Sequence, residues 1–215
     1  MSVFKKYDET NGKFGRVAEQ AIHNWLINNK YTVTPLPHGK YKWDCLAESE
    51  TEKAYVEVER RGSWKSGAFS FPTVHVPVRR YKSGDAWLFI VRCDLNAALV
   101  AFFKNFLVSN RVEVPNKFVE AGEEFFDIPI EWCLPIDMND HSGKTIAERN
   151  RQRIVNLLQE SRTRGCSVDY CKVILGPLAP YGMCDAEWNN LLVECNTDEL
   201  AEQRKPRDVQ GTLFY

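Results

Sequence analysis

Three carboxylates constrain this chain more than any other feature. Asp44 lies in an apolar-rich run, residues 41–46, and Glu57 and Glu59 lie in a second run after the polar residues 48–53. Two such runs around a polar turn predict a β-hairpin. Because side chains alternate across a strand, Glu57 and Glu59 point the same way, roughly 7 Å apart. The sequence therefore predicts that three carboxylates converge at one place.

Charges of one sign that lie so close destabilise a fold unless a cation lies among them. A hard divalent cation with oxygen ligands satisfies this need, with Mg²⁺ as the first expectation and Mn²⁺ as the alternative. A simpler interpretation is that Glu57 and Glu59 are solvated on the wet face of a strand, opposite Lys53 or Arg60. Both interpretations remain open on the hairpin alone.

A helix is predicted just before the hairpin. Apolar residues recur at helical spacing between residues 13 and 29, which indicates an amphipathic helix. Glu19 falls beside Leu26 at the border of its apolar face. If this helix packs on the hairpin, Glu19 joins the three carboxylates; otherwise its side chain extends to water.

A helix with Glu19, a strand ending at Asp44 and a next strand with Glu57-x-Glu59 resemble the core of the PD-(D/E)XK nucleases. The nearest branch is that of the Holliday-junction resolvases and restriction-type enzymes. The resemblance implies that Glu19, Asp44, Glu57 and Glu59 form the catalytic set. It also implies that Asp44 and Glu57 hold Mg²⁺, that the Val58 carbonyl is a further ligand, and that Glu19 supports the metal or its waters.

The resemblance covers about residues 12–92, and two positions depart from the family pattern. Trp43 precedes Asp44 where the family has proline, and Glu59 stands where the family has lysine. Glutamate at that place acts in some restriction enzymes as a base or second metal ligand, and it equally fits an inactive site. Without the lysine, a positive group must come from elsewhere. The nearest candidates in the sequence are Arg60, Arg61, Lys65 and His75.

The stretch after the hairpin predicts a nucleic-acid-binding surface. Residues 60–82 interleave basic and aromatic side chains and contain no acidic residue, a mixture suited to phosphate neutralisation and base packing. Residues 1–82 carry a charge of +5 and the remainder −6. A solvated loop is the alternative. The predicted nucleic-acid-binding residues are Arg60, Arg61, Lys65, His75, Arg79, Arg80 and Lys82.

The predicted fold class is α/β, a mixed β-sheet flanked by helices with a restriction-endonuclease-like core and a C-terminal helical extension. The apolar run 86–91 indicates a central strand. Residues 125–130 indicate a further strand, placed at an edge because of Pro129. Thr145 to Arg162 indicates an amphipathic helix. We expect a nuclease-like core over residues 1–135, the helical extension over 136–203 and a tail over 204–215.

The cysteines and the lack of targeting signals indicate the compartment. Seven cysteines in 215 residues fit reduced thiols better than a disulfide framework. Buried thiols are preferred over a structural zinc at Cys166, Cys171, Cys184 and Cys195, because their spacing lacks a CxxC pair. No apolar run reaches the ~18 residues of a membrane span, and the start lacks the apolar core of a secretion signal. We therefore expect a cytoplasmic protein with no membrane partner.

The tail predicts a protein partner. Gln210, Leu213 and Phe214 have the spacing of the peptide that docks bacterial replication and repair proteins on the sliding clamp. Docking of the tail on its own domain is the preferred alternative. The predicted partners are thus DNA, a sliding clamp and a second copy of the chain.

The sequence predicts a Mg²⁺-dependent endonuclease that hydrolyses phosphodiester bonds of DNA in repair or restriction. The first alternative is a catalytically inactive module of nuclease fold that binds nucleic acid or a protein. The second is a structural or interaction protein whose carboxylates are only solvated.

Overall fold

The computed structural model describes residues 9–37, 43–81, 86–116, 119–164, 186–190 and 193. The chain divides into two compact units, residues 1–150 and 151–215. The first contains α1 (Glu9–Asn28), β1 (Thr32–Pro35), β2 (Cys45–Glu48), β3 (Lys53–Arg61), β4 (Thr73–Pro77), the 3-10 helix η1 (Val78–Arg80), β5 (Ala86–Arg92), β6 (Ala97–Phe102), α2 (Phe103–Phe106), β7 (Asn110–Asn116), β8 (Val119–Pro129), the 3-10 helix η2 (Ile130–Trp132) and β9 (Leu134–Asp137). Helix α3 (Ile146–Thr163) begins in the first unit and continues into the second. The α/β class is confirmed.

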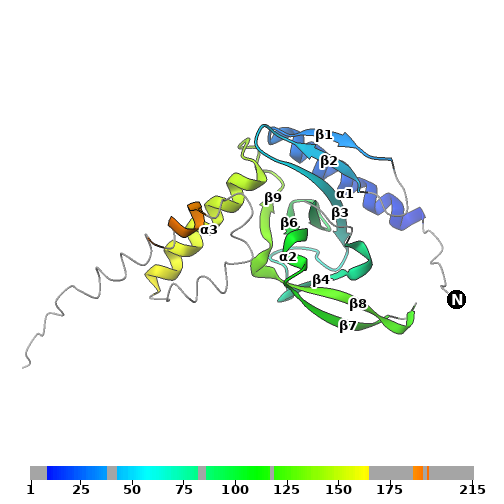
Figure 1. The fold of residues 1–215 in the computed structure, drawn as a ribbon. Helices are drawn as coiled ribbons and strands as arrows, with labels where there is room; N and C mark the ends of the chain where they lie inside the picture. The colour runs from blue at the N-terminus through cyan, green and yellow to red at the C-terminus, as the bar shows by residue number, and fades with distance from the viewer. Residues whose placement is uncertain are drawn as a thin grey trace, which may run out of the picture. The chain divides into compact units, whose positions relative to one another are not determined.

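A six-stranded mixed sheet forms the centre of the first unit, in the order β1-β2-β3-β5-β6-β9 (Figure 1). Strands β3 and β5 are parallel, and the other neighbours are antiparallel. The predicted hairpin is confirmed, because β2 pairs with β3 from Cys45↔Val56 to Glu48↔Lys53. The apolar run 86–91 is confirmed as a central strand, and its side chains are buried on both faces.

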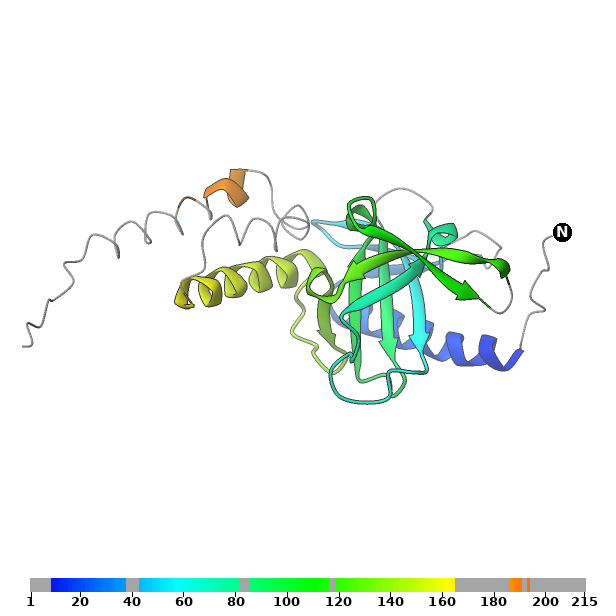
Figure 2. The ribbon, with the colours of Figure 1, turned by 90° about the horizontal axis from the view of Figure 1, so that it is seen from below.

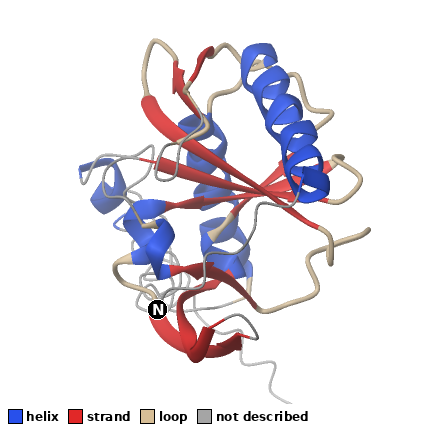
Figure 3. Cartoon of the chain, turned by 90° about the vertical axis from the view of Figure 1, so that its right-hand side faces the viewer, coloured by secondary structure: helices blue, strands red, loops and turns tan. Residues whose placement is uncertain are grey.

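Helix α1 covers one face of the six-stranded sheet (Figures 2 and 3). Its Trp25 ring lies 6.2 Å from the ring of Phe89, and Tyr31, just after the helix, lies 5.7 Å from Trp87. Trp87 and Phe89 alternate with Leu88 on β5, so they belong to the face toward α1. This face also carries Val56, the register partner of Trp87.

A three-stranded sheet, order β4-β8-β7, covers the opposite face. Leu88 and Ile90 pack there with Val76, Phe126 and Ile128 in one buried cluster. The prediction of an edge strand at residues 125–130 is wrong, since β8 is the middle strand of this sheet. Its proline, Pro129, is the last residue of the strand, where a missing amide donor interrupts the ladder least.

The first unit extends beyond the predicted boundary at residue 135. Strand β9 adds to the sheet beside β6, with Leu134 opposite Val100. The predicted helix at 145–162 is confirmed as α3. Its start is a capping box, in which the Thr145 amide donates to Glu148 Oε2 at 2.7 Å and the Glu148 amide donates to Thr145 Oγ1 at 3.2 Å. Such reciprocal bonds satisfy amides that a helix start leaves unpaired.

A buried hydroxyl connects α1, the hairpin turn and the start of α3. The Tyr31 hydroxyl donates to Glu52 Oε1 and accepts from the amide of Ile146. Glu52 Oε1 also accepts from the amide of Ala147 at 3.1 Å. Burial and the neighbouring Glu52 carboxylate both raise the pKa of Tyr31, so the hydroxyl keeps its proton. Among the described helices, none is long and apolar enough to cross a membrane.

We predict that Tyr31→Phe lowers the free energy of unfolding by about 1–3 kcal/mol, because the Ile146 amide then lacks its acceptor in a buried place. Urea unfolding followed by tryptophan fluorescence measures the change. Tyr55→Phe is the matched control, since Tyr55 is 41% exposed and its hydroxyl can bond to water. An equal effect of the two substitutions would contradict the role given to Tyr31.

Candidate functional site

Asp44 lies at a bend immediately before β2, so the strand begins after it and does not end at it as predicted. Its amide donates to Val56 O at 2.9 Å, while its carbonyl accepts from the amide of Leu36 at 3.0 Å. In a regular strand both groups of one residue point to the same side. Here the Asp44 amide points to β3 and the Asp44 carbonyl points to Leu36, just after β1, on the opposite side. In addition, the carboxylate Oδ2 of Asp44 accepts a hydrogen bond from the Val58 amide at 2.7 Å. Two hydrogen bonds thus fix the Asp44 backbone, and a third holds its carboxylate beside β3.

Glu57 and Glu59 lie on one face of β3, as the alternation predicts. Their register partners are Leu88 and Ile90, which belong to the face covered by the small sheet. The two glutamates are therefore on the face of β3 that points away from α1. Their side chains are only 15% and 19% exposed, so water screens their mutual repulsion poorly.

Two arginines neutralise this carboxylate pair. Arg80 Nη1 lies 2.6 Å from Glu59 Oε2 and 4.0 Å from Glu57 Oε1. Arg61 Nε lies 2.7 Å from Glu59 Oε1. The cation required by the sequence argument is thus present as guanidinium. The sequence predicts Arg80 only as a nucleic-acid contact. No spacing in the sequence indicates that Arg80 pairs with Glu59, because Arg80 belongs to η1, which follows β4 and brings the chain back to β3.

Glu19 lies on α1, on the opposite face of the sheet from Glu57 and Glu59. Its charge, after burial and the charge of Asp44, raises the pKa of the buried Cys45 thiol to about 12. Because α1 covers the face of the sheet that Glu57 and Glu59 point away from, Glu19 is not brought beside the two glutamates of β3.

The four predicted carboxylates do not form one cluster. Within the described ranges, no three side chains of histidine, cysteine, aspartate or glutamate lie close enough together to hold a metal ion. The arrangement has two parts instead: Asp44 beside the backbone of Val58, and Glu57 with Glu59 around Arg80. A metal bound here would therefore take two carboxylates at most from this set, and complete its shell with carbonyl oxygen, water or substrate.

Most of the predicted nucleic-acid-binding residues contact other protein groups. Arg60 Nε donates to the carbonyl of Cys93 at 3.1 Å, and its guanidinium lies 3.8 Å from the ring centre of Phe14. Arg79 pairs with Glu123, and His75 lies 3.1 Å from Asp127. These contacts use donors that a phosphate would otherwise take. Lys65 is exposed, and Lys82 lies outside the described residues.

Two further sets of predicted residues lie outside the described part of the chain. They are the four cysteines considered for zinc, Cys166, Cys171, Cys184 and Cys195, and the tail residues considered for the sliding clamp, Gln210, Leu213 and Phe214. Their interpretations stay predictions.

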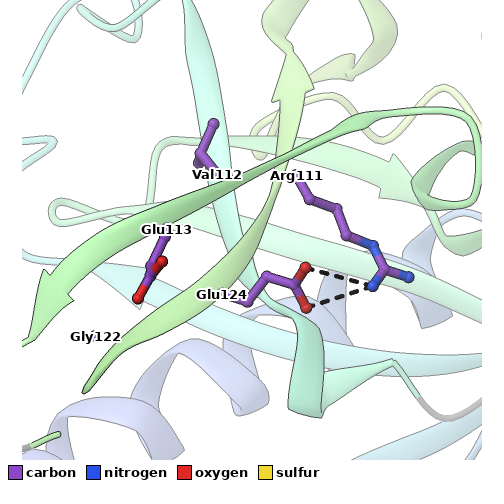
Figure 4. A pocket seen from close by; sticks show the side chains of 5 residues that line it. All are labelled: Arg111, Val112, Glu113, Gly122 and Glu124. Carbon is purple, nitrogen blue, oxygen red and sulfur yellow. Dashed lines mark hydrogen bonds and ion pairs between the residues drawn. The ribbon is translucent and has the colours of Figure 1, made fainter. Parts of the chain in front are cut away.

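A shallow pocket of about 420 Å³ lies away from these carboxylates, on the β7–β8 hairpin (Figure 4). Arg111 Nη1 lies 3.3 Å from Glu124 Oε2 across its wall. Gly122 has φ +80° and lies so close to Glu113 that an added Cβ would be 2.7 Å from Oε1. The pocket is lined by a paired arginine and two glutamates, and no residue of the predicted site contributes to it.

Comparison of the chain with protein-family models, with curated proteins and with solved structures finds no match.

We predict that Arg80→Ala lowers the free energy of unfolding by about 1–2 kcal/mol, because two half-buried glutamates lose a shared cation. Arg79→Ala is the control, since its side chain is 69% exposed and an exposed pair contributes little. Added salt should reduce the Arg80 effect by screening the remaining repulsion. Equal losses for the two variants in urea unfolding would contradict this account.

Proposed function

We propose that this protein is a metal-dependent nuclease of the PD-(D/E)XK type that hydrolyses phosphodiester bonds of DNA. The proposal rests on one observation above the others: Asp44 is fixed immediately before β2, with its amide bonded to Val56 O and its carboxylate to the Val58 amide, the two residues that flank Glu57 on β3. The chain order α1, β1, β2, β3 supports it, because the helix with Glu19 precedes the two hairpin strands, as the sequence resemblance requires.

The oxygen atoms around Asp44 fit a hard divalent cation. Mg²⁺ is commonly held by one or two carboxylates, with waters and substrate phosphates as the other ligands. Asp44 and Glu57 are the carboxylates that would hold it. The Val58 amide points to Asp44, and the carbonyl of an extended residue points to the same side as its amide. Val58 therefore offers a third oxygen toward the same place.

A divalent ion held there would neutralise charge on the phosphoryl oxygens and lower the pKa of the attacking water. The chain itself supplies the second positive group. Arg80 lies between Glu57 and Glu59, and a guanidinium can donate two parallel hydrogen bonds to phosphoryl oxygens. Since its hydrogen bond to Glu59 fixes Arg80 before substrate arrives, little reorganisation is needed when charge develops.

Glu59 then acts as a positioning residue. Both of its carboxylate oxygens are paired with arginine, one with Arg61 and one with Arg80. A carboxylate held in this way is a poor candidate for a general base or a metal ligand, because either role would require it to leave two cations. The positive charge that lysine supplies in the resembling enzymes would here come from Arg80.

A specific observation favours a second candidate function, a non-catalytic module of the same fold that binds nucleic acid or protein. The guanidinium groups of Arg61 and Arg80 already neutralise Glu59, and that of Arg80 also lies 4.0 Å from Glu57. The glutamate pair therefore does not depend on a metal for its stability. Metal binding by the full-length chain separates the two candidates.

We predict that Asp44→Asn and Glu57→Gln each abolish Mg²⁺-dependent cleavage of DNA while leaving the protein folded. Linear, nicked and four-way DNA substrates, with Mg²⁺ or Mn²⁺, measure the activity, and calorimetric titration measures metal binding. Glu48→Gln is the matched control on the same hairpin, because the Glu48 side chain is 40% exposed and pairs with Lys53. Undiminished cutting by both site variants would sink the assignment, and a wild type that binds no metal would favour the non-catalytic module.

The role of Glu59 is tested by two substitutions at that position. Glu59→Gln should lower activity, because Arg80 loses its charged anchor. Glu59→Lys should retain more activity than Glu59→Gln, because an ammonium then lies near the place of the Arg80 guanidinium. If Glu59→Lys is as inactive as Asp44→Asn in the same cleavage assay, the Glu59 carboxylate itself takes part as a ligand or a base.

A further inference from the structure

A row of four aromatic rings lies beside the carboxylates. The rings of Tyr55 and Trp43 are stacked, with centres 5.8 Å apart and planes at 15°. Trp43 meets Phe103 edge to face at 5.0 Å, and Phe103 stacks with Tyr81 at 6.0 Å. Phe103 is 1% exposed, so the row is anchored in the core at that ring.

The row follows the candidate site closely along the chain. Tyr55 and Glu57 are two residues apart on β3, so they share a face and lie about 7 Å apart. Trp43 immediately precedes Asp44, and Tyr81 immediately follows Arg80. Asp44, Glu57 and Arg80, the three groups that would handle the phosphate, thus each have an aromatic residue of the row within two positions along the chain.

Tyr55 ends the row at the surface. It is 41% exposed, although Glu57 and Glu59 on the same face are half buried and residues 86–91 of neighbouring β5 are buried. Its stacking on Trp43 fixes the plane of the ring, and tyrosine has few rotamers to lose on binding. A rigid, exposed ring is suited to receive a flat partner by stacking.

We propose that Tyr55 and the row behind it bind an unpaired nucleobase, which makes single-stranded DNA, or a single-stranded stretch beside a duplex, the substrate class of this site. A base inside a duplex already stacks on its neighbours, so only an unpaired base can offer its face to Tyr55. A base on Tyr55 would place its own phosphate toward Asp44 and Glu57. This inference rests on the proposed nuclease function for the identity of the ligand.

The net negative charge of the carboxylates explains why stacking matters here. The three carboxylates of Asp44, Glu57 and Glu59 outnumber the two arginines, Arg61 and Arg80, that pair with the glutamates, so phosphate attraction alone does not hold a strand at this place. Stacking on an aromatic ring contributes affinity without regard to charge or to base identity. The strand would therefore bind with little sequence preference at the cleavage site.

The test uses the full-length protein and an oligonucleotide that carries 2-aminopurine, whose fluorescence falls on stacking. Binding is measured in Ca²⁺ for the wild type, and without metal in the Asp44→Asn, Glu57→Gln double variant, where the repelling charges are gone. Tyr55→Ala should weaken single-strand binding about tenfold or more in both backgrounds and abolish quenching. Tyr55→Phe, which keeps the ring, should bind normally. Duplex binding should not change.

Ile27→Ala is the control, because Ile27 is a similarly exposed apolar residue, at 57%, and lies on α1, outside residues 60–82 and outside the aromatic row. Single-strand binding of Tyr55→Ala equal to that of the wild type overturns the inference, as does an equal loss in Ile27→Ala. Tyr55-dependent quenching in a protein that never cleaves DNA sinks the nuclease proposal and leaves the stacking site in place. Cleavage of duplex and single-stranded DNA alike, without dependence on Tyr55, overturns the stacking proposal and leaves the nuclease proposal in place.

Discussion

The parallel pairing of β3 with β5 is the constraint from which the candidate site follows. Antiparallel strands can be joined by a tight turn, but parallel strands need a long crossover that passes over the sheet. Here the crossover contains β4 and η1, which return across the face that carries Glu57 and Glu59. Arg80 and Tyr81 reach β3 through this connection. The crossover that the parallel pairing requires thus carries both the Arg80 guanidinium, which pairs with the two glutamates, and the Tyr81 ring of the aromatic row.

The parts of the fold that depend on local periodicity could be predicted from the sequence. The hairpin, helix α1 and the central strand β5 each have a pattern of period two, a helical period or a continuous apolar run within one segment. Glu57 and Glu59 were placed on a common face for the same reason. Pro129 shows the limit of a local rule, because the sequence cannot show that a proline is the last residue of a middle strand.

The parts of the site that depend on tertiary placement could not be predicted. The helical position of Glu19 shows that it borders an apolar face, but not which face of the sheet the helix will cover. Composition shows that residues 60–82 are basic, but not that Arg60, Arg61 and Arg80 are bound to carbonyl and carboxylate oxygens. A pair such as Glu59 and Arg80 is set by the crossover, and no spacing within either segment indicates it.

Cys45 lies in the core on the α1 face of β2. Burial first, and then the charges of Asp44 and Glu19, raise the pKa of its thiol to about 12. Because the thiolate is the reactive form of cysteine, a thiol held in its protonated form is a poor nucleophile and a poor metal ligand. Although it is the neighbour of Asp44 in the sequence, Cys45 is therefore expected to be chemically inert.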